Sequence, residues 1–270
     1  MIKFLKGLKY VVLTIVSFIS VFPLYWMFSA STNTNLDVTK GRLLPGTAFL
    51  DNYYELLQTA PHLWTSMKNS LTYAVCVTFL SLLVSSLAGY GFEIYNDKYK
   101  DKVMFLLLTA MMVPFVAIMI PLFTLVSKLG LLNTAVGFVF PSIATPFLIM
   151  LFRQSSRSFP RDIIEAARID GLGEVMIFFR AYIPIMRSTY AAAMTIVFMG
   201  AWNSYLWPKI IMTNGQTITM PMLITNLKTG YTLDYGVLMT AVCIGTIPTI
   251  LIFFVLQKSF AEGIAGSVKG

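Results

Sequence analysis

The stretch at residues 70–92, SLTYAVCVTFLSLLVSSLAGYGF, contains no charged side chain. Its length and composition are typical of a transmembrane helix, because a helix that crosses a bilayer needs about 20 mostly apolar residues. A strand is excluded here, since an isolated strand would leave backbone groups unpaired in hydrocarbon. The whole chain agrees with this interpretation, because 57% of its 270 residues are hydrophobic and only 12% are charged.

The sequence contains five further apolar segments, so we predict an all-α polytopic membrane protein with about six transmembrane helices. One transmembrane domain is expected over residues 1–270. The predicted spans are approximately 10–30, 70–92, 103–126, 135–152, 189–207 and 235–256, with an outer loop at 31–69, a cytoplasmic loop at 153–187 and a cytoplasmic tail at 257–270. Prolines interrupt the third, fourth and sixth of these spans, and they produce either simple kinks or broken helices that line a pathway.

The first predicted span is expected to stay attached rather than to be removed as a secretory signal. Three lysines precede the apolar run, as they do in signal peptides. The run at 10–30 is longer than the apolar region of a signal, however, and it contains Pro23, Tyr25 and Trp26.

Lysine and arginine residues predict the orientation of the chain. With the N-terminus inside, the inner segments carry Lys3, Lys6, Lys9, Lys98, Lys100, Lys102, Arg153, Arg157, Arg161, Arg168, Arg180, Arg187, Lys258 and Lys269. The outer segments then carry only Lys40, Arg42, Lys68, Lys128, Lys209 and Lys228. Since cytoplasmic loops are rich in Lys and Arg, both termini are predicted to be cytoplasmic. Nucleic-acid binding is not expected despite the net charge of +8, because the basic residues flank apolar segments.

No catalytic or metal site is predicted, and no cofactor is expected on this chain. Cys76 and Cys243 lie within apolar segments without metal-ligand spacing, and the single histidine, His62, lies in the outer loop. The sequence has no G-x-x-x-x-G-K-[ST] phosphate loop. It also lacks a carboxylate pair within a span, which a proton-coupled transporter usually needs. The chain is therefore not expected to be an enzyme.

The connection between the fourth and fifth spans has a helix–turn–helix pattern. Pro160 and Asp162 suit a helix start. Asp170-Gly171 predicts a turn, because glycine tolerates a positive φ and aspartate can cap the helix after the turn. A second helix is expected at roughly 172–182 and is ended by Pro184. The apolar and small residues of this connection either pack on the protein's own spans or fit a groove on a cytoplasmic partner.

This connection resembles the EAA loop of ABC importer permeases, which reads EAA, three residues, Gly, nine residues and then I-x-L-P. Glu165-Ala166-Ala167, Gly171 and Pro184 stand at matching positions, while Ala181 and Ile183 replace the usual Ile and Leu. Residues 198–208, FMGAWNSYLWP, resemble the tryptophan–asparagine segment of the maltose-type permeases, and residues 256–270 resemble their C-terminal tail. The likeness covers nearly the whole chain, which is similar to the smaller permease of such a pair.

The resemblance implies a type I ABC importer permease fold and a permease subunit of an ATP-driven carbohydrate importer in the cell (plasma) membrane, with an oligosaccharide as the expected substrate. The implied partners are a second homologous permease, two ATPase subunits that bind the ATP and Mg²⁺, and an extracellular solute-binding protein. The residues implied to dock on the ATPase are Glu165, Ala166, Ala167, Asp170, Gly171 and Pro184, together with the tail residues Gly266, Lys269 and Gly270.

Two questions stay open at the level of sequence. Trp202, Asn203 and Tyr205 form either an aromatic belt with one packed asparagine or a gate or patch that faces the sugar. The chain as a whole is alternatively a self-sufficient secondary transporter or channel, or a membrane scaffold or receptor. The absence of ionisable pairs within the spans argues against a secondary transporter.

Overall fold

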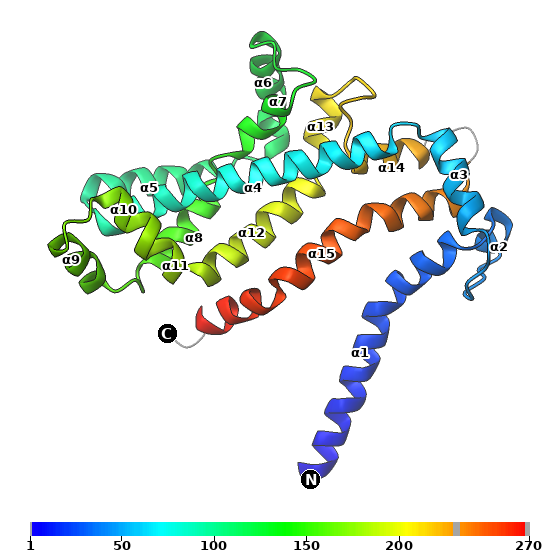
Figure 1. Ribbon diagram of the computed structural model, residues 1–270, viewed down its shortest axis with the longest axis horizontal. Coiled ribbons are helices and arrows are strands. Elements are labelled where there is room, and N and C mark those ends of the chain that lie inside the picture. The colour runs from blue at the N-terminus through cyan, green and yellow to red at the C-terminus, as the bar shows by residue number, and fades with distance from the viewer. Residues whose placement is uncertain (1, 229–232, 268–270) are drawn as a thin grey trace. The chain divides into compact units, whose positions relative to one another are not determined.

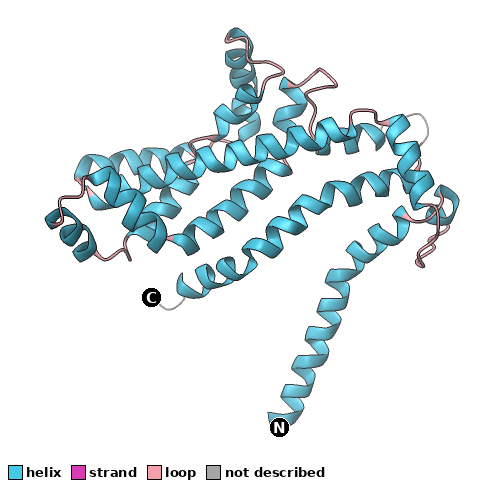
Figure 2. Cartoon of the chain, viewed as in Figure 1, coloured by secondary structure: helices cyan, strands magenta, loops and turns pink. Residues whose placement is uncertain are grey.

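The computed structural model describes the backbone of residues 2–228 and 233–267 and the side chains of residues 6–228 and 233–257. Within these ranges every regular element is a helix, and no strand occurs (Figures 1 and 2). The predicted all-α fold class is confirmed. The described chain divides into two compact units, which we describe separately: unit 1 holds residues 1–64 and 222–247, and unit 2 holds residues 65–221 and 248–270.

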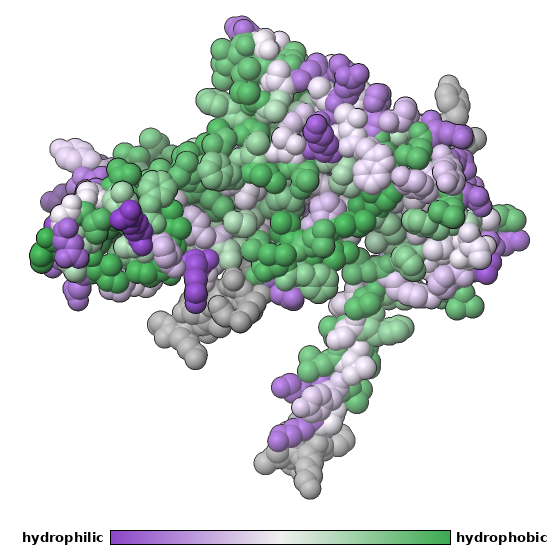
Figure 3. Space-filling view, viewed as in Figure 1, coloured by the Kyte–Doolittle hydropathy of each residue, from purple (hydrophilic) through white to green (hydrophobic). Residues whose placement is uncertain are grey.

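Three helices are long and apolar enough to cross a bilayer alone. They are α1 (Ile2–Ser31), α4 (Leu63–Ile94) and α15 (Tyr235–Ser267), whose apolar windows have mean hydropathies of 2.1, 2.0 and 2.3. Large apolar side chains on them are exposed, as are those on α5 (Lys98–Ala110), for example Phe18, Ile19 and Phe105 (Figure 3). Such extensive exposed apolar surface is what lipid, rather than water, would solvate.

Three bent helix pairs also have the length and composition of a span. The described residues therefore hold three spans, or up to six if each bent pair is one span. The pairs are α5 with α6 (Phe115–Lys128), α7 (Ala135–Val139) and η1 (Phe140–Ser142) with α8 (Pro146–Ser156), and the segment Glu174–Ile185 with Arg187–Ile211. Their bends measure 99°, 48° and 82°. The last pair comprises α10 (Glu174–Ile177), η2 (Phe178–Tyr182), α11 (Ile183–Ile185), α12 (Arg187–Trp202) and α13 (Leu206–Ile211).

The segment predicted as one span at 103–126 departs most from expectation. The helix ends at Ala110 and restarts at Phe115, and the two parts meet at 99°. Pro114 explains the break, because proline disfavours a helical residue before it and supplies no N–H. Its own backbone is extended, with φ −61° and ψ 138°. The break is therefore a change of direction rather than the simple kink that one proline usually makes.

The outer loop of unit 1 is shorter than predicted, because α4 begins at Leu63 rather than near residue 70. It contains α2 (Asn35–Thr39) and α3 (Phe49–Thr59). The division between the two units along the chain, between residues 221 and 222, falls within α14 (Met220–Lys228). Asp51 does not cap α3: the cap position is Ala48, without a side-chain bond, and Asp51 lies in the first turn. Buried Asn52 fastens α3 to the end of α1, since its Nδ2 donates to the carbonyls of Ser31 and Asn33, each at 2.9 Å.

The core of unit 2 is a close crossing of α4 and α8. A Cβ added at Gly89 would lie 2.6 Å from Phe152 Cβ and 2.7 Å from the backbone nitrogen of Arg153. Leu82, Leu148, Phe152 and Ala193 are buried together beside this crossing. Glycine is thus required in α4 for the two helix backbones to approach.

Candidate functional site

The helix of the predicted docking loop is α9 (Arg161–Ile169), at one end of unit 2 (Figure 1). It follows Pro160, carries Asp162 in its first turn and Arg168 in its last. Both charges favour the helix, because its N-terminus is partially positive and its C-terminus partially negative. The predicted helix start is confirmed to within one residue.

Gly171 makes the predicted turn with φ +79°, a backbone conformation that residues with a Cβ rarely adopt. The N–H of Gly171 donates to the Arg168 carbonyl at 3.0 Å, and the N–H of Leu172 donates to the Ala167 carbonyl at 2.9 Å. This pair of bonds is a Schellman motif, which closes the end of a helix. Asp170 is the C-cap of α9 and does not cap the next helix, whose cap position is Gly173 without a side-chain bond.

Helix α9 has one buried and one exposed face, so the expected packing on the protein's own helices is found on one face, and the other face is left for the partner contact that stays a prediction. Ile164 and Ala167 pack in a buried cluster with Tyr90 of α4 and with Phe178 and Tyr182. Glu165, Ala166, Asp170 and Gly171 are exposed, and Pro184 is exposed farther along the chain. Apolar side chains accompany them at the surface, where Ile169 is 86% and Val175 72% exposed.

The second half of the loop is less regular than the single helix predicted at 172–182. It consists of α10, the π-helical turn η2 and α11, and it ends at Ile185, one residue beyond Pro184. The wider π turn fits the proline, because a proline ring in an α-helix would clash with the carbonyl four residues earlier, here that of Arg180.

An ion pair closes the turn between the halves of the loop. Arg168 Nε lies 2.7 Å from Glu174 Oε1, and the Tyr95 hydroxyl, just past the end of α4, also donates to Glu174. The hydrogen bond to Glu174 raises the pKa of Arg168 above its ordinary value, so the guanidinium stays charged. The loop is therefore attached to α4 by this polar contact as well as by the apolar cluster.

A partly buried charge network joins the preceding helix to α4 and α5. Arg153 of α8 is only 9% exposed, and its Nε lies 3.4 Å from Glu93 Oε2 while its Nη2 lies 2.5 Å from Asp101 Oδ1. Arg157 Nε lies 3.7 Å from the same Glu93 oxygen. Local sequence patterns do not show these pairings, because they depend on which helices are neighbours.

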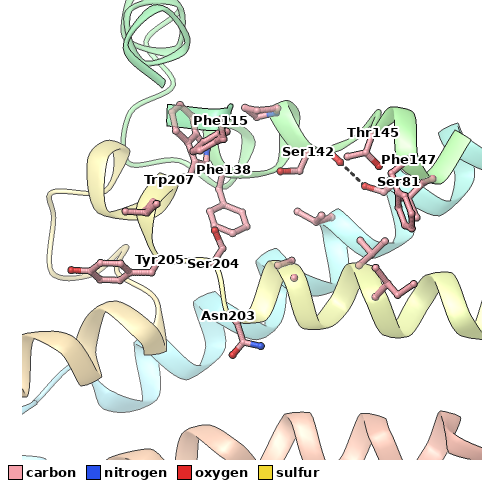
Figure 4. A pocket seen from close by; sticks show the side chains of 18 of the residues that line it. Ser81, Phe115, Phe138, Ser142, Thr145, Phe147, Asn203, Ser204, Tyr205 and Trp207 are labelled. Carbon is pink, nitrogen blue, oxygen red and sulfur yellow. Dashed lines mark hydrogen bonds between the residues drawn. The ribbon is translucent and has the colours of Figure 1, made fainter. Parts of the chain in front are cut away.

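A cavity of about 840 Å³ lies in unit 2 where three helix breaks meet (Figure 4). Phe115 follows the break between α5 and α6, Ser142 and Thr145 flank the break before α8, and residues 203–205 form the break between α12 and α13. Ser81 of α4 also lines it and donates to the Ser142 carbonyl at 2.7 Å. The sequence shows a proline at two of these breaks, Pro114 and Pro146. It does not identify Ser81, Ser142 or Thr145 as residues that line a cavity.

The three residues proposed as a gate or patch separate in the structure. Asn203 and Tyr205 line the cavity, whereas Trp202 is buried and stacks on Phe198 with ring centroids 6.0 Å apart. Asn203 points away from Ser81 and Thr145 in Figure 4, and its Nδ2 donates to the Met199 carbonyl at 2.9 Å. Trp202 is thus a packed residue that does not line the cavity.

Trp207 is the tryptophan that lines the cavity. Its Nε1 donates to the Gly137 carbonyl at 3.1 Å, which attaches α13 to α7. A Cβ at Gly137 would lie 2.3 Å from the Leu131 carbonyl oxygen, so the site needs glycine there. Of the tail residues, Gly266 belongs to α15, while Lys269 and Gly270 lie outside the described residues.

Comparison with known proteins identifies the family. The family described as "binding-protein-dependent transport system inner membrane component" matches residues 81–266. The chain is 44% identical over 264 residues to the lactose transport system permease protein LacG of Rhizobium radiobacter, covering 97% of this chain and 95% of that one. It is 33% identical over 260 residues to the arabinooligosaccharides transport system permease protein AraQ of Halalkalibacterium halodurans, with 94% and 93% covered.

A solved structure of a bacterial ABC transporter involved in the import of the acidic polysaccharide alginate has the same fold. Its chain superposes with a TM-score of 0.85, at 24% identity, over 96% of this chain and 97% of that one. The predicted type I ABC importer permease fold is confirmed, and the predicted resemblance with it. The chain is a multi-pass membrane protein and belongs to the family of inner membrane components of binding-protein-dependent transport systems.

Proposed function

We propose that this chain is the permease subunit of an ATP-driven ABC importer for a carbohydrate, most simply an oligosaccharide, and forms half of the translocation pathway. The permease relatives named for lactose and arabinooligosaccharides support a sugar substrate. The partners are a second homologous permease, two ATPase subunits that bind ATP and Mg²⁺, and an extracellular solute-binding protein. Both termini and the loop at 153–187 lie in the cytoplasm, in keeping with the distribution of Lys and Arg.

The observation that carries this proposal is the two-faced helix α9. Its inner face is fixed to α4 through Ile164 and Ala167, and its outer face presents Glu165, Ala166 and Ile169 without cover in the described chain. An ATPase that binds the outer face can therefore move α4 through the inner one. Such a rigid contact is needed if ATP binding to a partner is to change the balance between two permease conformations.

The remaining functional residues have supporting roles. Asp170, Gly171 and Pro184 give the docking loop its shape, and Gly266, Lys269 and Gly270 of the tail contact the ATPase. Asn203 and Tyr205 line the substrate pathway, and Trp202 packs on Phe198 beside this segment.

The direct test is co-purification of the tagged chain from its host membranes. We expect an ATPase and a second permease to be recovered with the wild-type chain. Ile169→Asp places a charge on the exposed face of α9 and should remove the ATPase while retaining the second permease. Leu36→Asp, at another exposed apolar position in the outer loop, serves as the matched control. Equal ATPase recovery with Ile169→Asp and Leu36→Asp would refute docking at α9.

A further inference from the structure

We propose that the loop between α2 and α3, residues 40–47, dips into the lipid bilayer beside the end of α1, with Leu43 and Leu44 among the acyl chains and the basic residues before them at the level of the headgroups. The inference gives a partner to a surface that the proposed function leaves unused. Only the choice of leaflet, the outer one, rests on the orientation proposed above.

Helix α2 ends in a turn that sends the chain back toward α1. Gly41 has φ +75°, and its N–H donates to the Val38 carbonyl at 3.0 Å. The N–H of Arg42 donates to the Asp37 carbonyl, also at 3.0 Å. This pair of bonds is a Schellman motif, which reverses the chain at the end of a helix. In Figure 1 the segment that follows lies beside the C-terminal end of α1.

Two hydrogen bonds fix how far the loop reaches back along α1. The carbonyl of Leu43 accepts from the Tyr25 hydroxyl at 3.0 Å and from Ser29 Oγ at 2.7 Å. Both donors precede the last residue of α1, Ser31, and belong to the apolar window that gives this helix the length of a span. The loop therefore lies beside the last two turns of the span rather than beyond its end.

The backbone of the loop is suited to a membrane interface. The Leu44 carbonyl accepts from Asn33 Nδ2 at 2.9 Å, and the N–H of Gly46 donates to Thr32 Oγ1 at 2.9 Å. Pro45, between them, has no N–H to satisfy. Irregular backbone that enters a bilayer must find such partners within the protein, because lipid offers none. These bonds hold the polar groups of the loop against the end of α1.

The side chains of the loop extend the apolar surface of α1. Leu43 is 48% and Leu44 70% exposed. At the same level of α1, Leu24 and Phe28 are exposed as well, and Tyr25 presents a partly exposed ring with its hydroxyl on the loop. Tyrosine is enriched at this depth because its ring is apolar and its tip is polar. Lipid that solvates this part of α1 would therefore also meet the two leucines.

The charges beside the leucines favour a phospholipid over a protein partner. Lys40 and Arg42 are exposed just before the leucines. Long basic side chains at a membrane surface extend toward lipid phosphates while their stems cover apolar surface. A solute-binding protein approaches from water and would meet the far side of the outer loop, which carries Asp51 and Glu55. The second permease is the other candidate cover, and the experiment separates it from lipid.

The test measures the depth of a nitroxide spin label on Leu44→Cys, with Cys76 and Cys243 replaced by alanine. The purified complex is reconstituted in vesicles of equal parts phosphatidylcholine and phosphatidylglycerol. Collisions of the label with oxygen, which enters lipid, are compared with collisions with a water-soluble nickel chelate. We expect the ratio of oxygen to nickel collisions at Leu44→Cys to be several-fold higher than at Glu55→Cys, the exposed control on α3. Phe105→Cys, on the exposed apolar surface of α5, supplies the value for lipid.

Two results would overturn the inference. A ratio equal to that of Glu55→Cys would place the loop in water, and few collisions with either reagent would show that a protein covers it. Leu43→Cys is the second variant, should Leu44→Cys fail to accumulate, and the same results apply to it. Addition of the solute-binding protein should leave the ratio unchanged, and a fall in oxygen collisions on its addition would also overturn the inference.

The leaflet and the proposed function are tested separately. A membrane-impermeant maleimide should label Glu55→Cys in intact cells, and failure to label it would overturn the assignment to the outer leaflet together with the proposed orientation. Sugar uptake by the reconstituted complex reports the proposed function alone. Absence of uptake with a high collision ratio at Leu44→Cys would contradict the importer and support the lipid contact.

Discussion

The Ser156 hydroxyl lies 2.7 Å from the Tyr182 hydroxyl in the buried interior of unit 2. Ser156 ends α8 and Tyr182 ends the π turn of the docking loop, so the contact ties the entry of the loop to its exit. Tyr182 also stacks on Phe178 and meets Tyr90 of α4 edge-on, with ring centroids 5.3 Å and 4.8 Å apart. The loop therefore moves with α4 and α8.

Tyr182→Phe should weaken this attachment without changing the ring packing. Ser156 Oγ would keep its bond to the Phe152 carbonyl, at 2.7 Å, and lose only the tyrosine. We expect a loss of about 1 kcal/mol in unfolding free energy, seen as a lower Tm of the purified complex. Ser158→Ala, at an exposed serine that bonds only within its own turn, is the control. An unchanged Tm for Tyr182→Phe would contradict the assigned contact.

Arg153→Met should be the most damaging change at the ends of the helices. It leaves the Glu93 carboxylate, 15% exposed, with only the more exposed Arg157 nearby. Removing one member of a buried pair costs about 3–5 kcal/mol, because the other charge stays buried. We expect the amount of folded protein in the membrane to fall sharply. The double variant Arg153→Met with Glu93→Gln should recover much of it, and failure to recover would show that Glu93 is not the partner that matters.

Gly171→Ala should strain the turn of the docking loop, because φ is +79° there. The expected cost is about 1–2 kcal/mol, the penalty for a Cβ in the left-handed region. Uptake should fall while membrane insertion is kept, since only the loop is affected. Gly173→Ala is the matched control, because its φ is −74° and nothing lies within 4 Å of an added Cβ. Equal uptake by both variants would argue against a rigid turn.

Gly89→Ala and Gly91→Ala test the crossing of α4 and α8. The Cβ at position 89 would overlap Phe152 and the backbone of Arg153, whereas the Cβ at position 91 meets nothing within 4 Å. We expect a destabilisation of about 1–3 kcal/mol for the first and none for the second, since alanine favours a helix over glycine. Thermal unfolding in detergent measures both. The reverse order of the two stabilities would contradict the packing described here.

Local sequence patterns predict the features that depend on neighbouring residues. Apolar length predicts α1, α4 and α15, and the Asp170-Gly171 pair predicts the turn that Gly171 makes. Features that depend on tertiary packing cannot be predicted from local sequence patterns. The pairing of Arg153 with Glu93 joins residues 60 positions apart, and the cavity combines residues from α4, α6, α7 and α12 with loop residues.

The prolines in the sequence also predict only part of the structure. Pro114 and Pro146 stand where helices are broken, whereas Pro121 lies inside α6, so a proline in the sequence does not by itself predict a break. Pro114 stands at a bend of 99° and Pro146 at one of 48°. Asp170 fails as the predicted cap, because it ends α9 and the next helix has Gly173 at its cap position.

The most direct test of ATP-driven import is sugar uptake by the complex reconstituted in proteoliposomes, with and without ATP and Mg²⁺ on the side of the ATPase. We predict uptake only when the ATPase, the binding protein and ATP are present, and none with an ion gradient alone. We also predict that Ile169→Asp abolishes this uptake. Gradient-driven uptake by the purified single chain, without ATP or any partner, would contradict this mechanism.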